Sequence, residues 1–361
     1  MGTQTPSALK APLRVIALTK ESPEYGGHSS YYTQAFHFAP DDGVKVKIVT
    51  PRAGLLSRLS GKIFSAWIGA EARNQAESAA ELRFLTHTQF DSGALGHIAN
   101  IEDHLPLLRS LKATHPRWLA TVHFPATHWV ETDAAKLRHF QKVITLCRRD
   151  AKFFARWMPE DRIAFIPHGV DTVFFRPDDV ARSQSPRLVF VGKWLRDFDM
   201  AGSVFLAALE EWPNLAIDVV VPLRWAQGTK LAALRENPRI HWHENVDDKT
   251  LRAIYQRAWL LVLPLHETGA NNTLVEALAC GLVPVTNHIG GIPDYGGGNF
   301  FPTCSENSVA AYLNHIGNLI RSPENRAAAS AACRQFAETQ LDWKLVRAQH
   351  LALYKTLLPS R

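Results

Sequence analysis

Residues 264–294 read PLHETGANNTLVEALACGLVPVTNHIGGIPD, and this stretch decides the fold that we expect. Just before it, the apolar run of residues 259–263 predicts a fully buried strand, and a helix is expected over residues 273–280. Gly281 suits the left-handed position at which helices end. A buried strand, a turn of small polar residues and a helix N-terminus make a cradle for phosphate, because backbone N–H groups there lack partners and the helix dipole favours an anion.

Two carboxylates, Glu267 and Glu276, lie on either side of this turn. Ionised carboxylates only accept hydrogen bonds, so they suit sugar hydroxyls rather than phosphate. A ligand that carries both phosphate and hydroxyl groups is a sugar nucleotide. The alternative is an ordinary strand–helix unit of a parallel sheet, although packing alone requires neither an acid pair nor the Asn271-Asn272 turn.

The same stretch resembles the donor-binding motif of family 4 glycosyltransferases, which are retaining enzymes with the GT-B fold. The family motif has two glutamates separated by seven residues, then Ala-hydrophobic-Ala-x-Gly-x-Pro-Val and a Gly-Gly turn. Here Glu276 opens EALACGLVPV and Gly290-Gly291 follows, but eight residues, one more than in the family, separate Glu267 from Glu276. The resemblance implies that Glu276 holds the donor ribose and that Glu267 holds the donor sugar.

The resemblance covers nearly the whole chain and is strongest over residues 163–295. Residues 166–171, IPHGVD, are similar to the family's interdomain signature, in which Gly169 suits a tight turn with positive φ. Residues 189–193, VFVGK, look like the strand that opens the nucleotide domain, and residues 248–258 look like the helix before the donor strand.

The expected fold is α/β of the GT-B type: two Rossmann-like domains facing across a cleft, with a C-terminal helix crossing back to the first. Strand-like and helix-like segments alternate, and residues 13–18 and 188–191 each read as the first strand of a half. The polar, proline-flanked residues 176–186 are the candidate linker. We therefore expect an acceptor domain over residues 1–178, a nucleotide-sugar donor domain over residues 179–340 and the crossing helix over residues 341–361.

Composition agrees with a two-domain globular protein. The chain has 361 residues, of which 46% are hydrophobic, but no apolar run long enough to span a membrane. Residues 1–13 lack the apolar core of a signal peptide and are expected to be a short disordered leader. The four cysteines are scattered without a CxxC pair, which favours a reducing cytoplasm over a disulfide framework: Cys147, Cys280, Cys304 and Cys333.

The resemblance assigns the donor diphosphate to a basic loop, residues 192–199, GKWLRDFD. Lys193 matches the family's first phosphate-binding cation, which stabilises the leaving group as the glycosidic bond breaks. Phe198 stands where the family has a second lysine, and Arg196 is predicted to replace it because its planar fork suits phosphate. The donor-binding residues expected at the turn and helix start are Asn271, Asn272, Thr273 and Leu274.

In the N-terminal half, the resemblance assigns the transferred sugar to His123, which ends a predicted strand. The carboxyl ends of strands are where sites form in α/β proteins. Gly26 and Gly27 match the family's Gly-Gly loop, where glycine lets the backbone approach the donor phosphates. His87 follows a strand-like run, residues 82–86, and is expected to be structural or to face the acceptor.

Two short patterns are compatible with metal binding, but we expect neither to hold a metal ion. Asp197 and Asp199 spell Asp-x-Asp, but this pattern is short and lies within the phosphate loop. His241 and His243 share one face of a strand-like run without a further ligand nearby. We expect no metal and no cofactor beyond the nucleotide-sugar substrate.

Residues 52–73 place apolar side chains at helical spacing, among them Leu55, Leu59, Ile63 and Trp67, beside arginine and lysine. Such a helix can lie in a membrane interface or bind a lipid acceptor, and the alternative is a helix packed on the N-terminal sheet or a loop. The net charge of +6 suits an anionic partner, and without an RNA-binding signature nucleic acid is not expected. The expected location is the cytoplasm, and the alternative is the inner face of the membrane.

The function predicted from these features is a retaining glycosyltransferase. It moves a hexose from a UDP or GDP sugar to a hydroxyl of a glycan, glycolipid or lipid-linked acceptor. Two alternatives stay open: another GT-B enzyme, such as a sugar-nucleotide epimerase or a phosphorylase, and a nucleotide-binding protein without catalysis. Donor hydrolysis in the absence of acceptor distinguishes the transferase from the binding protein, and epimer formation identifies the epimerase.

Overall fold

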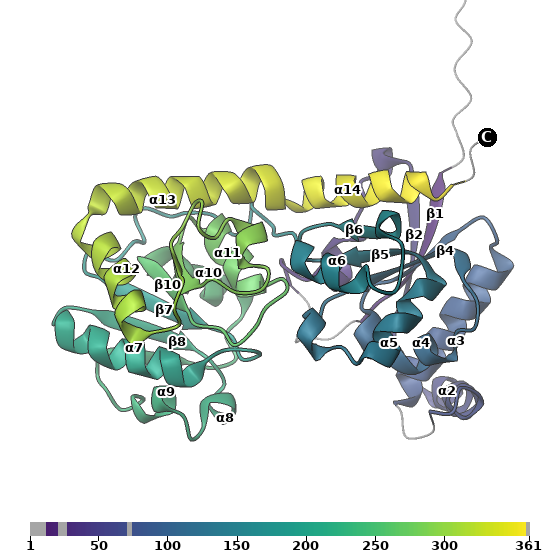
Figure 1. Cartoon of the computed structure of the whole chain (residues 1–361), viewed down its shortest axis with the longest axis horizontal. Helices are drawn as coiled ribbons and strands as arrows, with labels where there is room; N and C mark the ends of the chain where they lie inside the picture. Colours follow the sequence, from purple (N-terminus) through teal and green to yellow (C-terminus); the bar gives the residue numbers. More distant parts are fainter. Residues whose placement is uncertain (1–11, 21–26, 71–73, 359–361) are drawn as a thin grey trace, which may run out of the picture.

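The computed structural model describes residues 12–20, 27–70 and 74–358, which form two α/β domains side by side (Figure 1). The first domain is built on a six-stranded sheet in the order β2-β1-β3-β4-β5-β6, and all neighbouring strands run parallel. Its strands are β1 (Leu13–Leu18), β2 (Val44–Val49), β3 (Leu95–Ile98), β4 (His115–Val122), β5 (Phe140–Thr145) and β6 (Ile163–Phe165).

The second domain repeats this plan with a parallel sheet in the order β12-β11-β10-β7-β8-β9. Its central strands read as near-continuous apolar runs because helices cover both faces of a parallel sheet, and every residue of β10 is buried. The strands are β7 (Arg187–Val191), β8 (Ala216–Val220), β9 (Ile240–His243), β10 (Leu260–Leu263), β11 (Val283–Asn287) and β12 (Thr303–Cys304).

Helices surround both sheets. In the first domain they are α1 (Tyr31–Gln34), α2 (Leu55–Trp67), α3 (Gln75–Phe90), α4 (Leu105–Ser110), α5 (Glu131–Ala134) and α6 (Arg148–Phe154). In the second they are α7 (Phe198–Glu211), α8 (Leu223–Ala226), α9 (Lys230–Ala233), α10 (Asp248–Arg257), α11 (Asn272–Ala279), α12 (Val309–Arg321) and α13 (Pro323–Phe336). Gly281 follows α11 with φ of 63°, the left-handed conformation expected for it.

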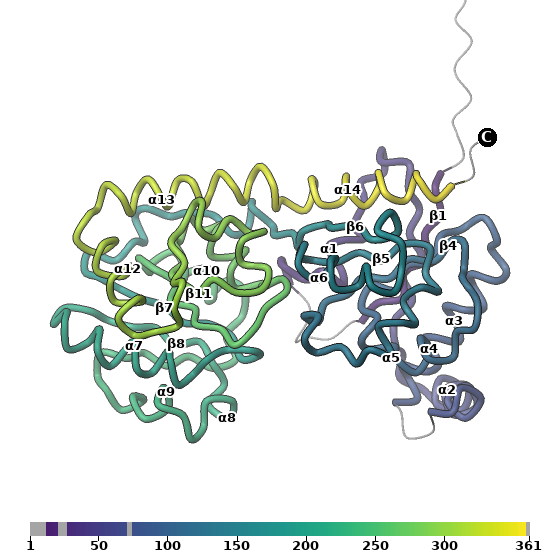
Figure 2. Tube along the Cα trace, viewed as in Figure 1, coloured from purple at the N-terminus to yellow at the C-terminus, as the bar shows by residue number. Residues whose placement is uncertain are grey.

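The last helix, α14 (Trp343–Thr356), leaves the second domain and packs on the first (Figures 1 and 2). At its start, the Trp343 indole N–H donates to the His28 carbonyl oxygen over 3.0 Å, and the Val170 N–H donates to Leu341 O over 2.8 Å. Two facing parallel sheets joined by this crossing helix match the fold that the sequence predicted.

Two local expectations are wrong. Residues 82–86 belong to the helix α3 rather than to a strand, because Ala80 and Phe84, one helical turn apart, both pack into the core of the domain. Gly169 does not have a positive φ. It is required for close packing instead, since a Cβ atom there would lie 2.4 Å from a ring carbon of Trp343.

A chain of buried polar side chains ties α14 to the first sheet. The His350 Nδ1–H donates to Val346 O, so its Nε2 accepts from the Tyr31 hydroxyl at 2.6 Å. The Tyr31 oxygen in turn lies 3.0 Å from Thr121 Oγ1, which lies 2.8 Å from His97 Nε2. Burial lowers the pKa of both histidines, so both rings are neutral and the chain is held without ionic charge.

This chain predicts a specific pH dependence of stability. Burial lowers the pKa of His350 from 6.5 to about 4. The unfolded chain therefore takes up a proton near pH 6.5, while the folded chain does not. The contribution of neutral His350 to the free energy of unfolding is complete above pH 6.5 and is lost as the pH falls toward about 4. From pH 7.5 to pH 5 the free energy of unfolding loses about 2 kcal/mol through this residue.

Denaturant titration of wild type and His350→Gln isolates this contribution from all other titrating groups. The difference in unfolding free energy between the two proteins should shrink by about 2 kcal/mol between about pH 7.5 and about pH 5. A difference that is the same at both pH values would contradict a neutral, buried His350.

Candidate active site

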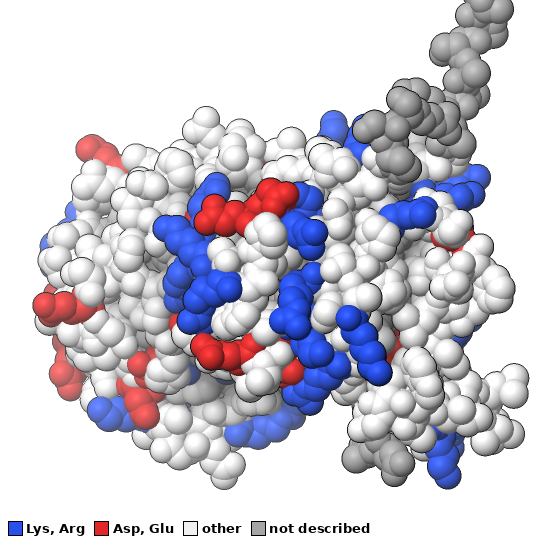
Figure 3. All heavy atoms as spheres, turned by 45° about the vertical axis from the view of Figure 1, so that its right-hand side comes forward, with Lys and Arg blue, Asp and Glu red and all other residues white. Residues whose placement is uncertain are grey.

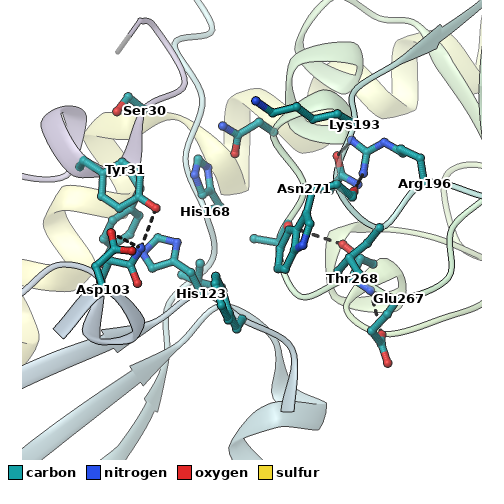
Figure 4. Close-up of a pocket in the computed structure, with 18 of the residues that line it drawn as sticks. Ser30, Tyr31, Asp103, His123, His168, Lys193, Arg196, Glu267, Thr268 and Asn271 are labelled. Atoms are coloured by element: carbon teal, nitrogen blue, oxygen red, sulfur yellow. Dashed lines mark hydrogen bonds between the residues drawn. The ribbon is translucent and has the colours of Figure 1, made fainter. Parts of the chain in front are cut away.

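A cleft of about 520 Å³ lies between the two domains. Residues from the loops that follow strands of both sheets line it: Lys20 after β1, Asn100 after β3, His123 after β4 and Leu146 after β5 on one side, and Lys193 after β7 and Glu267 after β10 on the other. Parallel strands end at the same edge of their sheet, which is why residues far apart in sequence meet here. Figure 4 shows the two groups facing each other across the cleft.

Most of the predicted site residues lie at this cleft. Those that line it are His123, Lys193, Arg196, Glu267, Asn271 and Asn272. Thr273, Leu274 and Glu276 lie further along α11, just behind the lining. Gly26 lies outside the described residues, whereas Gly27 has φ of +100°, and a Cβ atom there would lie 2.4 Å from an Asp248 carboxylate oxygen.

His123 is held as a neutral ring with a defined tautomer. Its Nε2–H donates to the Ala99 carbonyl over 2.8 Å, which leaves Nδ1 as an acceptor. The ring stacks on Tyr32 at 5.3 Å between centroids and meets the Tyr31 ring edge to face at 4.8 Å. Burial lowers the pKa of His123 to about 3. A neutral imidazole acceptor of this kind suits a sugar hydroxyl.

The backbone that carries His123 is held by Glu102, a residue that the sequence did not indicate. One carboxyl oxygen of Glu102 accepts the backbone N–H groups of His123 and Phe124, each over 2.7 Å. Burial raises the pKa of Glu102 to about 8, although both backbone hydrogen bonds favour the charged form. These partners lie more than 20 residues away in sequence, so only the fold reveals the contact.

Arg196 holds the phosphate loop against α11. Its Nε donates to Val191 O and one terminal nitrogen donates to Trp194 O, while the other reaches Asn271 Oδ1 and Thr273 Oγ1, both at 3.1 Å. Burial lowers the pKa of Arg196 to about 10. Most of its N–H donors are therefore used within the protein, so it positions the loop, and its predicted contact with the diphosphate stays a prediction.

Lys193 extends from the same loop into the cleft (Figure 4). Its ammonium group lies 5.5 Å from the centre of the Trp225 ring. Phe198, which stands where the related family has a second lysine, packs against Phe190 in the core at 5.8 Å between ring centroids. Lys193 is thus the cation of this loop that reaches toward the opposite domain.

The start of α11 forms the predicted cradle, with one difference. Asn271 caps the helix, and its Oδ1 accepts the Leu274 N–H over 3.3 Å. Leu274 therefore has its backbone donor engaged by the cap. The N–H groups of Asn272 and Thr273 are the first-turn donors that this arrangement leaves for an anion.

Glu276 lies one turn further along α11 and is only 8% exposed. It accepts a hydrogen bond from the Tyr255 hydroxyl over 3.0 Å. Burial raises the pKa of Glu276 to about 7, against the opposing effects of Tyr255, Ser29 and Arg196. Its ionisation therefore changes near neutral pH.

Glu267 is bound across the domain interface. Its carboxylate lies 3.0 Å from the Arg149 guanidinium of α6 and accepts the Thr268 N–H over 2.8 Å, and in Figure 4 it points away from Lys193. Seven residues separate Thr268 from Glu276, so Thr268 has the spacing of the family motif, and it lines the cleft. The donor-sugar role of Glu267 stays a prediction.

His168 is a further cleft residue that we did not single out from the sequence. Its Nδ1–H donates to Gly169 O over 2.8 Å, so Nε2 is left as the acceptor, and burial lowers its pKa to about 4. Its backbone N–H donates to the Tyr295 hydroxyl over 2.8 Å, which ties the connection between the domains to the second domain. The sequence signal that could have identified His168 is its position in the IPHGVD segment, which resembles the family's interdomain signature.

Side chains of the two short patterns that are compatible with metal binding have hydrogen-bond or ion-pair partners within the protein. Asp197 caps α7 by accepting the Met200 N–H, and Asp199 accepts the Lys230 N–H. His243 pairs with the buried Asp218 at 2.8 Å. Within residues 12–20, 27–70 and 74–358, no group of three or more His, Cys, Asp or Glu side chains is placed to hold a metal ion.

The chain is similar to known glycosyltransferases. The family described as "Glycosyl transferases group 1" matches residues 185–322. Alpha-maltose-1-phosphate synthase from Mycolicibacterium smegmatis is 23% identical over 402 residues, covering 95% of this chain and 99% of that protein. Among solved structures, sucrose-phosphate synthase from Thermosynechococcus elongatus has a TM-score of 0.70 at 17% identity, covering 96% of this chain and 99% of that chain.

HepE from Anabaena, solved with UDP and glucose, has a TM-score of 0.68 at 13% identity, covering 95% of this chain and 100% of that chain. At such low identity these structures show a shared fold. The family match lies within the second domain, over residues 185–322, and the solved structures share the fold of the whole chain, which is the GT-B fold that the sequence predicted.

The raised pKa of Glu276 leads to a prediction for nucleotide binding. At pH 6 about a tenth of Glu276 is ionised and at pH 8 about nine-tenths, given its pKa of about 7. If the ionised carboxylate accepts ribose hydroxyls, Glu276→Gln should weaken UDP or GDP binding by about 1–3 kcal/mol at pH 8 and by clearly less at pH 6.

Calorimetric titration at both pH values measures this, with Glu211→Gln on the surface of α7 as the matched control. Comparison of the two variants cancels the titration of the nucleotide phosphate itself. If Glu276→Gln and wild type bind with equal affinity at pH 8, Glu276 does not hold the ribose.

Proposed function

We propose that this protein transfers a hexose, with retention of anomeric configuration, from a nucleoside-diphosphate sugar to an acceptor hydroxyl. The observation that carries the proposal is the meeting of three features at one cleft: the N-terminus of α11, the Lys193 ammonium group and the neutral His123 ring. The first two suit a diphosphate and the third suits a sugar hydroxyl. The resemblance to family 4 supports retention.

UDP is the favoured nucleotide of the donor. The support is the solved structure of HepE from Anabaena, which has the same fold and was obtained with UDP and glucose. GDP is the alternative, because the residues that contact the phosphates do not distinguish the two bases.

Each residue has a defined part in the proposed transfer. The diphosphate lies over the Asn272 and Thr273 N–H groups, and Lys193 stabilises the charge that grows on it as the bond to the sugar breaks. His123 accepts a hydrogen bond from the transferred sugar, and Glu276 accepts those of the ribose. A cationic side chain and a helix N-terminus at the leaving group replace the charge of a divalent ion, so we propose that the reaction is independent of metal.

Lys193→Ala tests this mechanism. Because the lysine charge matters most in the transition state, turnover at saturating donor should fall roughly 100-fold, more than the affinity for the nucleoside diphosphate falls. Lys112→Ala, which removes an exposed lysine of the first domain, is the matched control. Weaker affinity with unchanged turnover at saturating donor would show that Lys193 contributes no more to the transition state than to donor binding.

The assay itself tests the function. The protein is incubated with UDP-glucose and with GDP-mannose, without acceptor, before and after exhaustive EDTA treatment. Slow release of free hexose and nucleoside diphosphate, unchanged by EDTA, is the expected result. Formation of an epimer instead of a free hexose would identify an epimerase, and binding without any cleavage would identify a nucleotide-binding protein.

The surface of α2 supports a membrane-attached site of action. Leu55, Leu59, Ile63 and Trp67 repeat every four residues and are 53–75% exposed, while Phe64 on the opposite side of the helix is buried. The helix packs on α3 through its buried side and leaves its apolar side outward. Two cations, Arg58 and Lys62, are exposed beside the apolar side chains.

We propose that α2 binds the surface of an anionic membrane, where the acceptor is a growing glycan, a glycolipid or a lipid-linked sugar. Exposed cations and apolar side chains on one helix are the two components of interfacial attachment. The net charge of +6 adds long-range attraction. Figure 3 shows Lys and Arg side chains over the middle of one face, with Asp and Glu side chains among them. No helix within the described residue ranges is long and apolar enough to cross a bilayer.

Vesicle co-sedimentation tests this attachment. Wild-type protein should bind vesicles containing phosphatidylglycerol at low salt, release them as salt rises, and ignore vesicles of phosphatidylcholine alone. Ile63→Ser with Trp67→Ser should weaken binding at least tenfold, because both side chains insert into the interface. Leu206→Ser, at an exposed position of the second domain, is the matched control. Failure of wild type to bind anionic vesicles at low salt would favour a soluble acceptor.

A further inference from the structure

The N-terminal half of the cleft holds a small polar cluster beside His123. The Asp103 carboxylate lies 3.4 Å from the Lys20 ammonium group and accepts a hydrogen bond from Asn100 Nδ2 over 3.2 Å. Asn100 also donates to the Tyr32 hydroxyl over 2.9 Å. All four residues line the cleft. The positive charge on this side is thus matched by a carboxylate that is itself held in place.

Among the described residues that line this side of the cleft, Lys20 is the one cation. His123 and His168 both line the cleft, and burial lowers the pKa of each to about 3 and about 4, so both are neutral at physiological pH. A phosphate group on the acceptor would therefore meet one cation that is already paired, beside the diphosphate of the donor, and like charges there repel.

Three aromatic side chains line the same cleft while staying exposed to solvent. Phe124 follows His123 and is 37% exposed, and Trp194 follows Lys193 and is 44% exposed. Their rings lie 5.0 Å apart between centroids, across the boundary of the two domains. Trp225, beside Lys193, is 46% exposed. Exposed aromatic surface within a cleft indicates a ligand that covers it.

A pyranose ring matches these two features together. Its C–H bonds carry slight positive charge and pack on the negatively charged face of an aromatic ring, and its hydroxyls donate hydrogen bonds to a carboxylate. Phe124 and Trp194 supply the aromatic surface and Asp103 supplies the acceptor atoms, and all three line the cleft together with His123.

We propose that the acceptor end that enters this cleft is an uncharged sugar ring, stacked on Phe124 and Trp194 with a hydroxyl bound to Asp103. This rests on the proposed function. In the transfer, the acceptor oxygen forms a bond to the anomeric carbon of the donor sugar, the bond from that carbon to the diphosphate breaks, and the acceptor proton passes to the departing diphosphate. A sugar phosphate is the excluded class of acceptor.

An acceptor panel tests the proposal directly. UDP-glucose and GDP-mannose are each offered with neutral p-nitrophenyl glucosides, galactosides and mannosides of both anomers, and separately with glucose 1-phosphate and glucose 6-phosphate. We expect transfer to at least one neutral glycoside with kcat/KM at least tenfold above that of either sugar phosphate. A preference for a sugar phosphate, with donor hydrolysis intact, would overturn this inference and leave the proposed function standing. Absence of any donor cleavage would overturn both.

Variants assign the effect to the aromatic surface. Trp194→Ala and Phe124→Ala should each raise KM for the neutral acceptor about tenfold, while the Kd for UDP stays within twofold of wild type. Phe90→Ala, at an exposed position on α3 outside this cleft, is the matched control. A merely structural role would lower the melting temperature or weaken UDP binding as well. Unchanged acceptor KM in both variants would overturn the stacking role.

Discussion

The two halves of the cleft belong to separate sheets, and the contacts of α14 with the first domain keep them facing each other. The hydrogen bond between Tyr31 and His350, at 2.6 Å, lies at the centre of these contacts. The Tyr31 ring also packs edge to face against His123, so the same side chain connects the crossing helix to the site. Loss of this contact would change both the position of His123 and its distance from Lys193 across the cleft.

Burial explains the charges within the site. His123 and His168 stay neutral, while burial raises the pKa of Glu102 and of Glu276 toward neutrality. Among the described residues that line the cleft, three carry positive charge: Lys20 is paired with Asp103, Lys193 extends into the cleft, and Arg196 is held within the protein. Such a distribution suits a substrate whose charge is concentrated in one diphosphate and whose other parts carry only hydroxyls.

Local sequence predicted the fold and the strand, turn and helix start around Asn271. The strand, turn and helix around Asn271 are adjacent along the chain, so their geometry follows from local rules. Contacts between distant segments escaped prediction: Glu102 binds the His123 backbone, and Arg149 pairs with Glu267. The extra residue before Glu276 gives Thr268 rather than Glu267 the family's spacing, and both residues line the cleft.

A crystal structure of the protein with bound UDP tests the central claim most directly, since that claim concerns where a nucleoside diphosphate lies. The account predicts phosphate oxygens within about 2.7–3.2 Å of the Lys193 ammonium group and of the Asn272 and Thr273 backbone nitrogens. It also predicts ribose hydroxyls on the Glu276 carboxylate. Nucleotide bound away from α11, or with its phosphates turned from Lys193, would contradict the account.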